Sequence, residues 1–237
     1  VTTRIDSKLP DVGTTIFAVM SQKAHQSGAL NLAQGFPDFE CPEALRRKVE
    51  EAMAAGHNQY APMPGLPQLR ERIAEKVAAL YGAEIDPDRG ITVTCGATEA
   101  LFTAIQATVR PGDEVIVFDP AYDSYEPAVR LAGGTCIHLP LTAPDYTIDF
   151  DRLAAALSAR TRLVVINSPH NPTGAVLSAA DLDRLAVLLR DSGCYLLSDE
   201  VYEHIVFDGT MHASVLAHPE LRERSFAVSS FGKTYHT

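Results

Sequence analysis

The residues best suited to chemistry lie near the end of the chain. The last nine residues, SSFGKTYHT, place Lys233 between a glycine and a hydroxyl residue, and the earlier stretch DEVYEH supplies Asp199 and Tyr202. A lysine in a tight loop after a buried strand can be desolvated enough to act as a nucleophile and as a base towards a carbonyl compound. An amine, a carboxylate and a phenol together predict a site for pyridoxal phosphate.

The position of Asp199 supports this prediction. It follows the run from Tyr195 to Ser198, so we expect it at the carboxyl end of a central strand, the edge where α/β sheets bind ligands. A carboxylate there could hold the pyridinium nitrogen of the cofactor protonated and make the ring an electron sink. Tyr202 could donate to the cofactor phenolate from the same side. The alternative interpretations are a helix N-cap for Asp199 and an ordinary half-buried tyrosine at a sheet edge.

The stretch NSPHNPTG, residues 167 to 174, also follows a strand and is rich in turn formers, which predicts a rigid loop at the same edge. The amide of Asn171 could share the phenolate oxygen with Tyr202. Asn-Pro is equally the signature of a simple turn. His170 has no second metal ligand at a useful spacing and is interpreted as a loop residue.

Phosphate binding needs backbone amides at a helix N-terminus. The stretch CGATEAL offers a strand end, a glycine turn and a helix beginning near Thr98, so the amides of Ala97 and Thr98 are candidate phosphate donors. Ser230, three residues before Lys233, is a further candidate. Tyr122, just past a strand that ends at Phe118, could stack on a flat cofactor or simply pack in the core.

The elements that position these residues are visible as short β-branched runs that alternate with helical patterns. This alternation predicts an α/β fold with a mostly parallel sheet. The predicted strands are Ile91–Cys95, Glu114–Phe118, Thr135–Leu139, Leu163–Asn167, Tyr195–Ser198 and Phe226–Ser229. Helices are predicted near Pro42, from Leu66 to Leu80, near Thr98, and after a capping box formed by Ser178 and Asp181. Residues 1 to about 35 have no strong period and are interpreted as an arm.

Composition excludes several classes of protein. The 237 residues carry 20 Lys and Arg against 30 Asp and Glu, a net charge of -10, which argues against a nucleic-acid partner. The apolar runs are far shorter than the ~20 residues of a membrane helix, and no secretory signal is visible, so we expect a cytoplasmic protein without a membrane span. The four cysteines are widely spaced, which predicts no metal site.

Seven stretches carry a resemblance to a known family: LAQGFPDF (32–39), NQYAPMPGLPQLR (58–70), TCGATEAL (94–101), FDPAYDSYEP (118–127), NSPHNPTG (167–174), SDEVYEH (198–204) and SSFGKTYH (229–236). On these motifs the chain resembles the fold-type I, class I/II aminotransferases that depend on pyridoxal 5'-phosphate. It is most similar to the branch of methionine aminotransferases and kynurenine or glutamine transaminases. The resemblance implies an N-terminal arm over residues 1–35 and a cofactor-binding large domain over residues 36–237, built as an α/β/α sandwich.

The resemblance also implies roles for individual residues. Lys233 matches the Schiff-base lysine and Asp199 the carboxylate at the pyridinium nitrogen. Asn171 and Tyr202 match the partners of the phenolate oxygen, and Tyr122 matches the aromatic residue stacked on the ring.

Further roles concern the phosphate and the substrate. The phosphate contacts match Ala97, Thr98 and Ser230, while Tyr60 matches a tyrosine that reaches the phosphate bound by the partner subunit, which implies a homodimer with active sites at the interface. Gly35 matches the glycine that seats the substrate carboxylate.

The implied reaction moves an amino group from an amino acid to a 2-oxo acid by a ping-pong mechanism. The expected donor is methionine, an aromatic amino acid or a glutamine-like one, with Asn171 beside the substrate and Ile16, Phe17 and Tyr122 lining an apolar pocket. Two alternatives stay open: a C-S β-lyase that uses the same cofactor and fold, and a non-catalytic regulatory relative.

Members of the resembled family continue beyond the lysine. They add another phosphate-binding cation, an antiparallel strand of the large sheet, and a small domain whose arginine binds the substrate carboxylate. We therefore expect this sequence to be a portion of a longer enzyme. The portion would end before the last strand of the sheet and before the C-terminal small domain.

Overall fold

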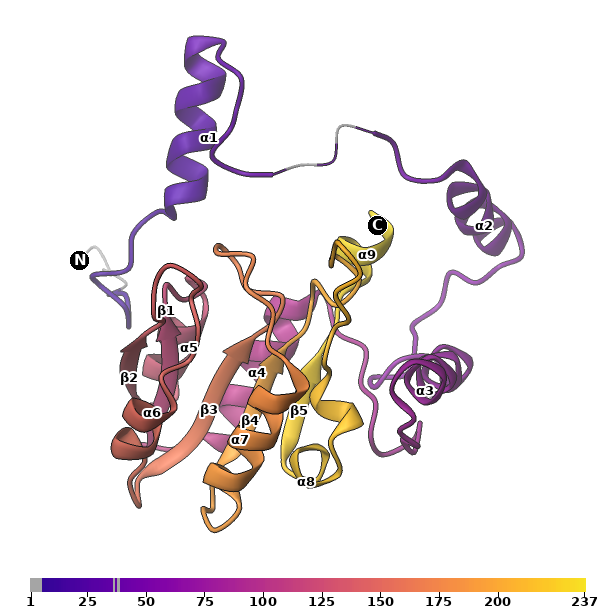
Figure 1. The fold of residues 1–237 in the computed structure, drawn as a ribbon. Coiled ribbons are helices and arrows are strands. Elements are labelled where there is room, and N and C mark those ends of the chain that lie inside the picture. The colour runs from indigo at the N-terminus through magenta and orange to yellow at the C-terminus, as the bar shows by residue number, and fades with distance from the viewer. Residues whose placement is uncertain (1–5, 36, 38) are drawn as a thin grey trace, which may run out of the picture.

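A five-stranded parallel sheet forms the centre of the structure, a computed structural model that describes residues 6–35, 37 and 39–237 (Figure 1). The strand order is β2-β1-β3-β4-β5, and every neighbouring pair is parallel. The strands are β1 (Glu114–Asp119), β2 (Thr135–Pro140), β3 (Thr161–Asn167), β4 (Tyr195–Asp199) and β5 (Ser225–Val228). Their carboxyl ends all lie at one edge, as the sequence predicts for a site built from strand ends.

Helices cover both faces of the sheet. The helices are α1 (Ile16–Ser27), α2 (Glu43–Ala54), α3 (Pro67–Tyr81), α4 (Ala97–Thr108), α5 (Tyr125–Leu131), α6 (Phe150–Ala156), α7 (Ala179–Leu189), α8 (Pro219–Arg222) and α9 (Phe231–Tyr235), with a short 3-10 turn, η1 (Val215–Ala217). Successive side chains of a strand point to opposite faces. In β1, Val115 and Val117 pack with α4 and α5, whereas Ile116 and Phe118 pack with α6, α7 and α8. The predicted α/β/α sandwich is confirmed.

The capping-box helix shows why this layer is stable. Ser178 accepts a hydrogen bond from the backbone of Asp181, and the Asp181 side chain accepts one from the backbone of Ser178. Leu182, Leu185 and Leu189 of α7 are buried against the sheet. Each buried leucine contributes about 1.5–3 kcal/mol through removal of apolar area from water, so α7 is part of the core, as its sequence pattern predicts.

The predicted strand at residues 91–95 is wrong. These residues have no ladder partner among the described residues, and the backbone N–H of Val93 instead donates to the carbonyl of Pro64 at 2.9 Å. Strand β5 ends the strand order and pairs only with β4. A β-branched run becomes a strand only where a neighbour completes its hydrogen bonds. The other predicted strands are present, with ends that differ by one or two residues.

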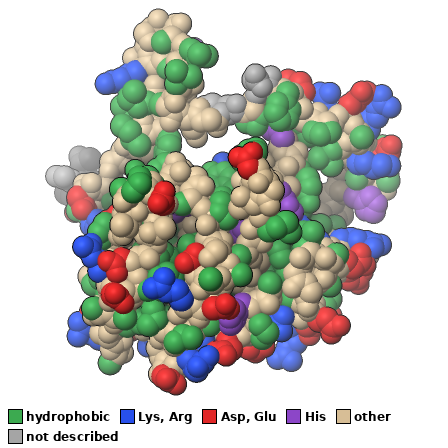
Figure 2. Space-filling model, viewed as in Figure 1, with side chains coloured by type: hydrophobic (Ala, Val, Ile, Leu, Met, Phe, Trp, Pro, Cys, Tyr) green, Lys and Arg blue, Asp and Glu red, His purple; other side chains and the backbone are tan. Residues whose placement is uncertain are grey.

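The segment predicted to be an arm contains a helix that its weak period did not predict. Helix α1 has Thr15 as its N-cap, which accepts a hydrogen bond from the backbone of Ala18, and Gly28 at φ 64° as its C-cap. None of its residues is buried. Figure 2 shows hydrophobic side chains exposed along this helix at the top of the view. Because burial normally produces the periodic signal, a helix without a buried face leaves little pattern in the sequence.

Helices α2 and α3 agree with the prediction. Helix α2 follows Pro42, which occupies the N-cap position, and α3 begins at Pro67 and ends before Gly82. In the described part of the chain, none of the helices combines the length and the apolar character that a membrane span needs.

Candidate active site

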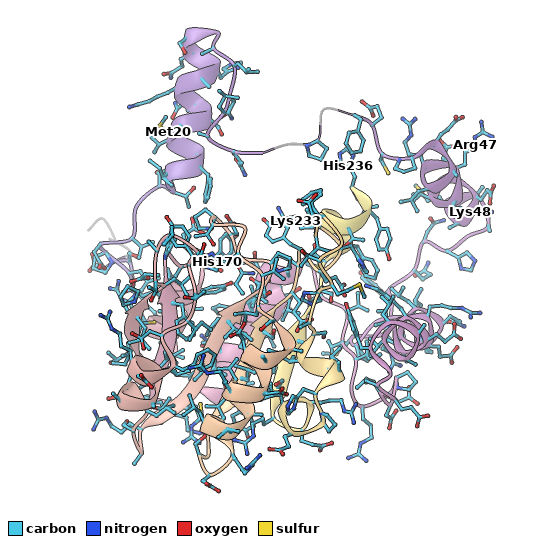
Figure 3. The ribbon with its side chains drawn as sticks, viewed as in Figure 1. Met20, Arg47, Lys48, His170, Lys233 and His236 are labelled. Atoms are coloured by element: carbon cyan, nitrogen blue, oxygen red, sulfur yellow. The ribbon has the colours of Figure 1, made fainter. Side chains whose placement is uncertain are left out.

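Most of the predicted site residues gather at the carboxyl edge of the sheet. Figure 3 shows Lys233 on α9 and His170 on the β3–α7 loop, both on this side of the molecule. Asp199 ends β4, where it pairs in register with Asn167 of β3 and Val228 of β5. The side chains of Tyr122 and Tyr202 and the N-terminal residue of α4, Ala97, pack against the same buried cluster.

Asp199 is a buried carboxylate with two fixed donors. It is 4% exposed; its Oδ2 accepts a 2.6 Å hydrogen bond from the Tyr125 hydroxyl, and its Oδ1 accepts one of 3.3 Å from the backbone N–H of Val201. Burial raises the pKa of Asp199, while the hydrogen bonds from Tyr125 and Val201 oppose that shift. A carboxylate in this setting gains from a cationic partner.

Tyr125 is a candidate site residue that sequence reasoning missed. It begins α5, is 4% exposed, and its ring meets the Tyr122 ring edge-on at 5.7 Å. Burial raises the pKa of Tyr125 well above its ordinary value, with the charge of Asp199 adding to the shift. The phenol is therefore a permanent donor to Asp199. The sequence shows this residue as the second tyrosine of DPAYDSYEP, but the direction in which its side chain points depends on where α5 begins.

Asn167 is a second missed residue, and it connects two parts of the site. Its Nδ2 donates to the carbonyl of Asp199 at 2.9 Å, and its Oδ1 accepts a 2.8 Å hydrogen bond from the backbone N–H of Asn171. The loop is closed further by a 2.8 Å hydrogen bond from the Gly174 N–H to the carbonyl of His170. The predicted loop is thus present and closed by hydrogen bonds, and Asn167 connects the backbone of Asn171 to that of Asp199.

His170 belongs to this loop. Its Nδ1 lies 2.8 Å from the Thr173 hydroxyl, and burial lowers its pKa. In the described part of the chain, no group of His, Cys, Asp and Glu side chains could hold a metal ion.

Lys233 and Tyr202 approach each other from two segments that follow different strands, helix α9 after β5 and a turn after β4. The Lys233 amine lies 5.7 Å from the centroid of the Tyr202 ring, although Lys233 itself is exposed. Burial raises the pKa of Tyr202, with Asp199 adding to the shift, so its phenol stays protonated and can donate. The Ser230 hydroxyl accepts a hydrogen bond from the backbone N–H of Lys233 at 3.2 Å and thereby caps the short helix α9.

The N-terminus of α4 opens onto this edge. Gly96 precedes it at φ 86°, a conformation that a side chain would strain. The Glu99 side chain accepts a hydrogen bond from the backbone of Cys95. The amides of Ala97 and Thr98 lie in the first turn, where a helix has no internal acceptor for them. The helix dipole and these amides form a site suited to an anion.

Three predicted residues lie apart from this group. Tyr60 is fully exposed, and Phe17 lies on α1, which projects from the body of the sheet (Figure 1). Gly35 is also exposed. Among the described residues, no hydrogen bond, ion pair or ring contact joins Phe17, Gly35 or Tyr60 to Asp199 or Lys233.

Comparison with known proteins agrees with this arrangement. A family model described as aminotransferase class I and II matches residues 27–236. The chain is 56% identical over 230 residues to the methionine aminotransferase of Escherichia coli (strain K12), which covers 97% of this chain and 60% of that protein. It is 42% identical over 233 residues to a probable N-succinyldiaminopimelate aminotransferase of Mycobacterium tuberculosis, covering 97% of this chain and 58% of that protein.

The structural neighbours agree. The crystal structure of YbdL from Escherichia coli, reported with a methionine aminotransferase function, superposes with a TM-score of 0.94 at 54% identity, covering 99% of this chain and 61% of that one. The chain thus spans about 60% of the length of these two curated relatives.

Proposed function

The chain belongs to the family of class I and II aminotransferases, and we propose that the protein it comes from transfers an amino group from an amino acid to a 2-oxo acid. The family depends on pyridoxal 5'-phosphate. Asp199 is the observation that carries the proposal: a buried carboxylate at a strand end, held by Tyr125 and facing the same edge as the only lysine of α9.

The residues at this edge fit the cofactor in charge and in donor type. Asp199 suits a protonated pyridine nitrogen, because burial makes an unpaired carboxylate costly and a cation relieves that cost. Tyr202 supplies a neutral phenol for a ring oxygen, and Asn171 a side-chain amide on the loop that Asn167 fixes. Tyr122 offers an aromatic face at the edge of the buried cluster.

The phosphate is proposed to bind at the N-terminus of α4. The amides of Ala97 and Thr98 would donate to it, and the Thr98 and Ser230 hydroxyls are further donors. Ser230 already accepts from the Lys233 backbone and keeps its own hydroxyl proton for the phosphate.

When bound, the cofactor supplies an electron sink for a carbanion at the substrate α-carbon. Lys233 would carry the proton: its amine would accept the α-proton of the substrate and hold it for return. Asp199 would hold the ring nitrogen protonated throughout. Tyr202 and Asn171 would orient the ring by hydrogen bonds to its oxygen.

The remaining assignments concern parts of the protein beyond this cluster. Residues 1–35 would form an arm and residues 36–237 the cofactor-binding domain. The high exposure of Tyr60 is consistent with a homodimer in which it reaches the partner subunit's phosphate site. Gly35, Phe17 and Asn171 are proposed to contact the substrate. The cytoplasmic location stays a prediction.

Methionine is the proposed amino donor, since the E. coli relative carries that name at 56% identity. The test is amino transfer from methionine to a 2-oxo acid by the purified protein with pyridoxal phosphate, with cystathionine alone as the second substrate. We expect a new amino acid from the first mixture. Release of pyruvate from cystathionine without an acceptor, and no transfer from methionine, would contradict the proposal and favour a C-S lyase.

A further inference from the structure

The segment that carries Tyr202 lies outside any helix or strand. It is a turn over residues 201–204, closed by a 2.9 Å hydrogen bond from the Glu203 N–H to the carbonyl of Glu200 and a 2.7 Å one from the Ile205 N–H to the carbonyl of Tyr202. Two local hydrogen bonds define the shape of a turn but not its position against the rest of the molecule. Side chains that reach other elements must fix that position.

Glu203 makes such a connection. It follows Tyr202 directly, is 3% exposed, and accepts a 2.7 Å hydrogen bond from the Lys76 amine and another from the Tyr81 hydroxyl. Both donors belong to α3, more than 120 positions earlier in the sequence. The turn is thereby attached to α3 by the buried carboxylate of Glu203.

The charge state of this group is fixed by its neighbours. Burial alone raises the pKa of Glu203, but the donors Lys76 and Tyr81 outweigh burial and lower it overall. Burial and the charge of Glu203 raise the pKa of Tyr81, so its phenol remains a donor. A buried ion pair of this kind is a poor source of stability, because desolvating the charges offsets their attraction. Its contribution is instead to geometry, because the two donors hold the Glu203 carboxylate in one position.

We propose that Glu203, Lys76 and Tyr81 form a positioning triad that holds the Tyr202 hydroxyl at the cofactor. The inference rests on the proposed function, in which Tyr202 donates to the cofactor ring oxygen. Glu203 itself touches neither cofactor nor substrate; it acts through the turn. A triad that served only to attach α3 would affect stability and leave the spectrum of the bound cofactor unchanged.

The test compares variants of the protein reconstituted with pyridoxal phosphate, by the pH midpoint of its visible absorption band. A hydrogen bond donated to the ring oxygen favours its deprotonated form and lowers that midpoint. Tyr202→Phe removes this hydrogen bond completely, so it should give the largest rise in the pH midpoint. We expect Glu203→Gln to raise the midpoint by on the order of half a pH unit, the equivalent of weakening one hydrogen bond. In the Tyr202→Phe background, Glu203→Gln should add nothing.

The matched control lies on the same helix. Arg72 and Glu75 form an exposed 2.6 Å ion pair on α3, so Glu75→Gln removes a charge from that helix without touching the turn. We expect no midpoint shift from it. Tyr81→Phe removes a single hydroxyl from the triad and should shift the midpoint in the same direction as Glu203→Gln, which provides a second variant if the first folds poorly.

Two outcomes would separate this inference from the function on which it rests. A wild-type protein that develops no visible band with pyridoxal phosphate would overturn the proposed function and the triad with it. A normal wild-type band whose midpoint is unchanged in both Glu203→Gln and Tyr81→Phe would overturn the triad alone, as would additive shifts in the double variant with Tyr202→Phe.

Discussion

The two charged groups at the centre of the site have opposite surroundings. Asp199 is buried at the end of β4, and Tyr125, Val201 and Asn167 hold its side chain and its carbonyl. Lys233 is exposed on the five-residue helix α9; Ser230 accepts from its backbone, and its amine meets only the ring of Tyr202 among the contacts of the described residues. One group is fixed by packing and hydrogen bonds, and the side chain of the other is exposed on a short helix.

Because of this difference, we expect the two groups to contribute differently to stability and to catalysis. A group that transfers a proton between two carbon atoms must change position during turnover, which an exposed lysine on a short helix can do. A group that stabilises a fixed charge works best when its geometry is set in advance. Substitutions on the Asp199 side should therefore alter both stability and function, whereas substitutions on the Lys233 side should alter function alone.

Lys233→Ala should have the largest effect on activity. Without the amine the site loses its proposed carrier of the α-proton, so we expect amino transfer to fall by about 10,000-fold. The visible band that borohydride abolishes in the wild type should be absent. The free energy of unfolding should stay within about 0.5 kcal/mol, since the side chain is exposed. Steady-state kinetics and urea unfolding measure the two effects.

The matched control for that variant is Lys23→Ala, which removes an exposed lysine from α1. It should leave the visible band unchanged. Substantial activity in Lys233→Ala would show that the proton carrier is another group and would remove the contrast between the two sides.

Asp199→Asn should follow, with activity lower by about 100- to 1,000-fold because the ring nitrogen loses its counter-charge. Here the stability also changes. The pKa of Asp199 is raised in the folded protein from its ordinary value of 3.8, mainly by burial, so the folded state binds this proton more tightly than the unfolded state. Ionisation then lowers stability as pH rises through the folded pKa.

The measurement is urea unfolding of the cofactor-free proteins at several pH values. The wild type should lose stability relative to Asp199→Asn as pH rises from about 4 towards neutrality. Added pyridoxal phosphate should restore the wild type and have little effect on the variant. A constant difference between the two proteins across this range would mean that Asp199 is not desolvated.

Tyr125→Phe should have a smaller effect. It removes the donor to Asp199 and keeps the ring in the core, so the pKa of Asp199 should rise further. We expect activity about tenfold lower near neutral pH, the equivalent of a hydrogen bond to a charged group. The acid side of the kcat/KM profile should also move to higher pH. Tyr146→Phe, at an exposed position, is the control; an identical profile in Tyr125→Phe would contradict the role.

The sequence predicted the groups of the site better than the contacts between them. Asp199 and Asn171 were predictable because each follows an apolar run, and the carboxyl ends of parallel strands meet at one edge. Tyr125 and Asn167 were missed, because their roles depend on where a helix begins and on a register between two strands. Neither property is visible in a linear pattern.

The same limit explains the errors in the fold. Residues 91–95 have the composition of a strand, but a strand also needs a neighbour, which composition does not specify. Helix α1 has helical caps, yet it buries no residue and so lacks a periodic signal. Local sequence predicted elements that the core stabilises, such as α7, and failed where tertiary contacts decide.

Ser230→Ala should have the smallest effect. A second N-cap serine, Ser178, provides its matched control. Ser178 and Ser230 are both N-caps whose hydroxyls accept from the residue three positions later. Ser178→Ala should lower the free energy of unfolding by about 1 kcal/mol, because α7 belongs to the core, and leave cofactor affinity unchanged. Ser230→Ala should do the reverse: α9 buries no residue, so stability changes little, while the dissociation constant of pyridoxal phosphate rises by about fivefold through the loss of one phosphate donor. Equilibrium titration and urea unfolding of both variants measure this, and equal effects on affinity would place Ser230 with the structural caps. The Ser230 hydroxyl can therefore be used for a ligand at little cost in stability, because α9, unlike α7, buries no residue.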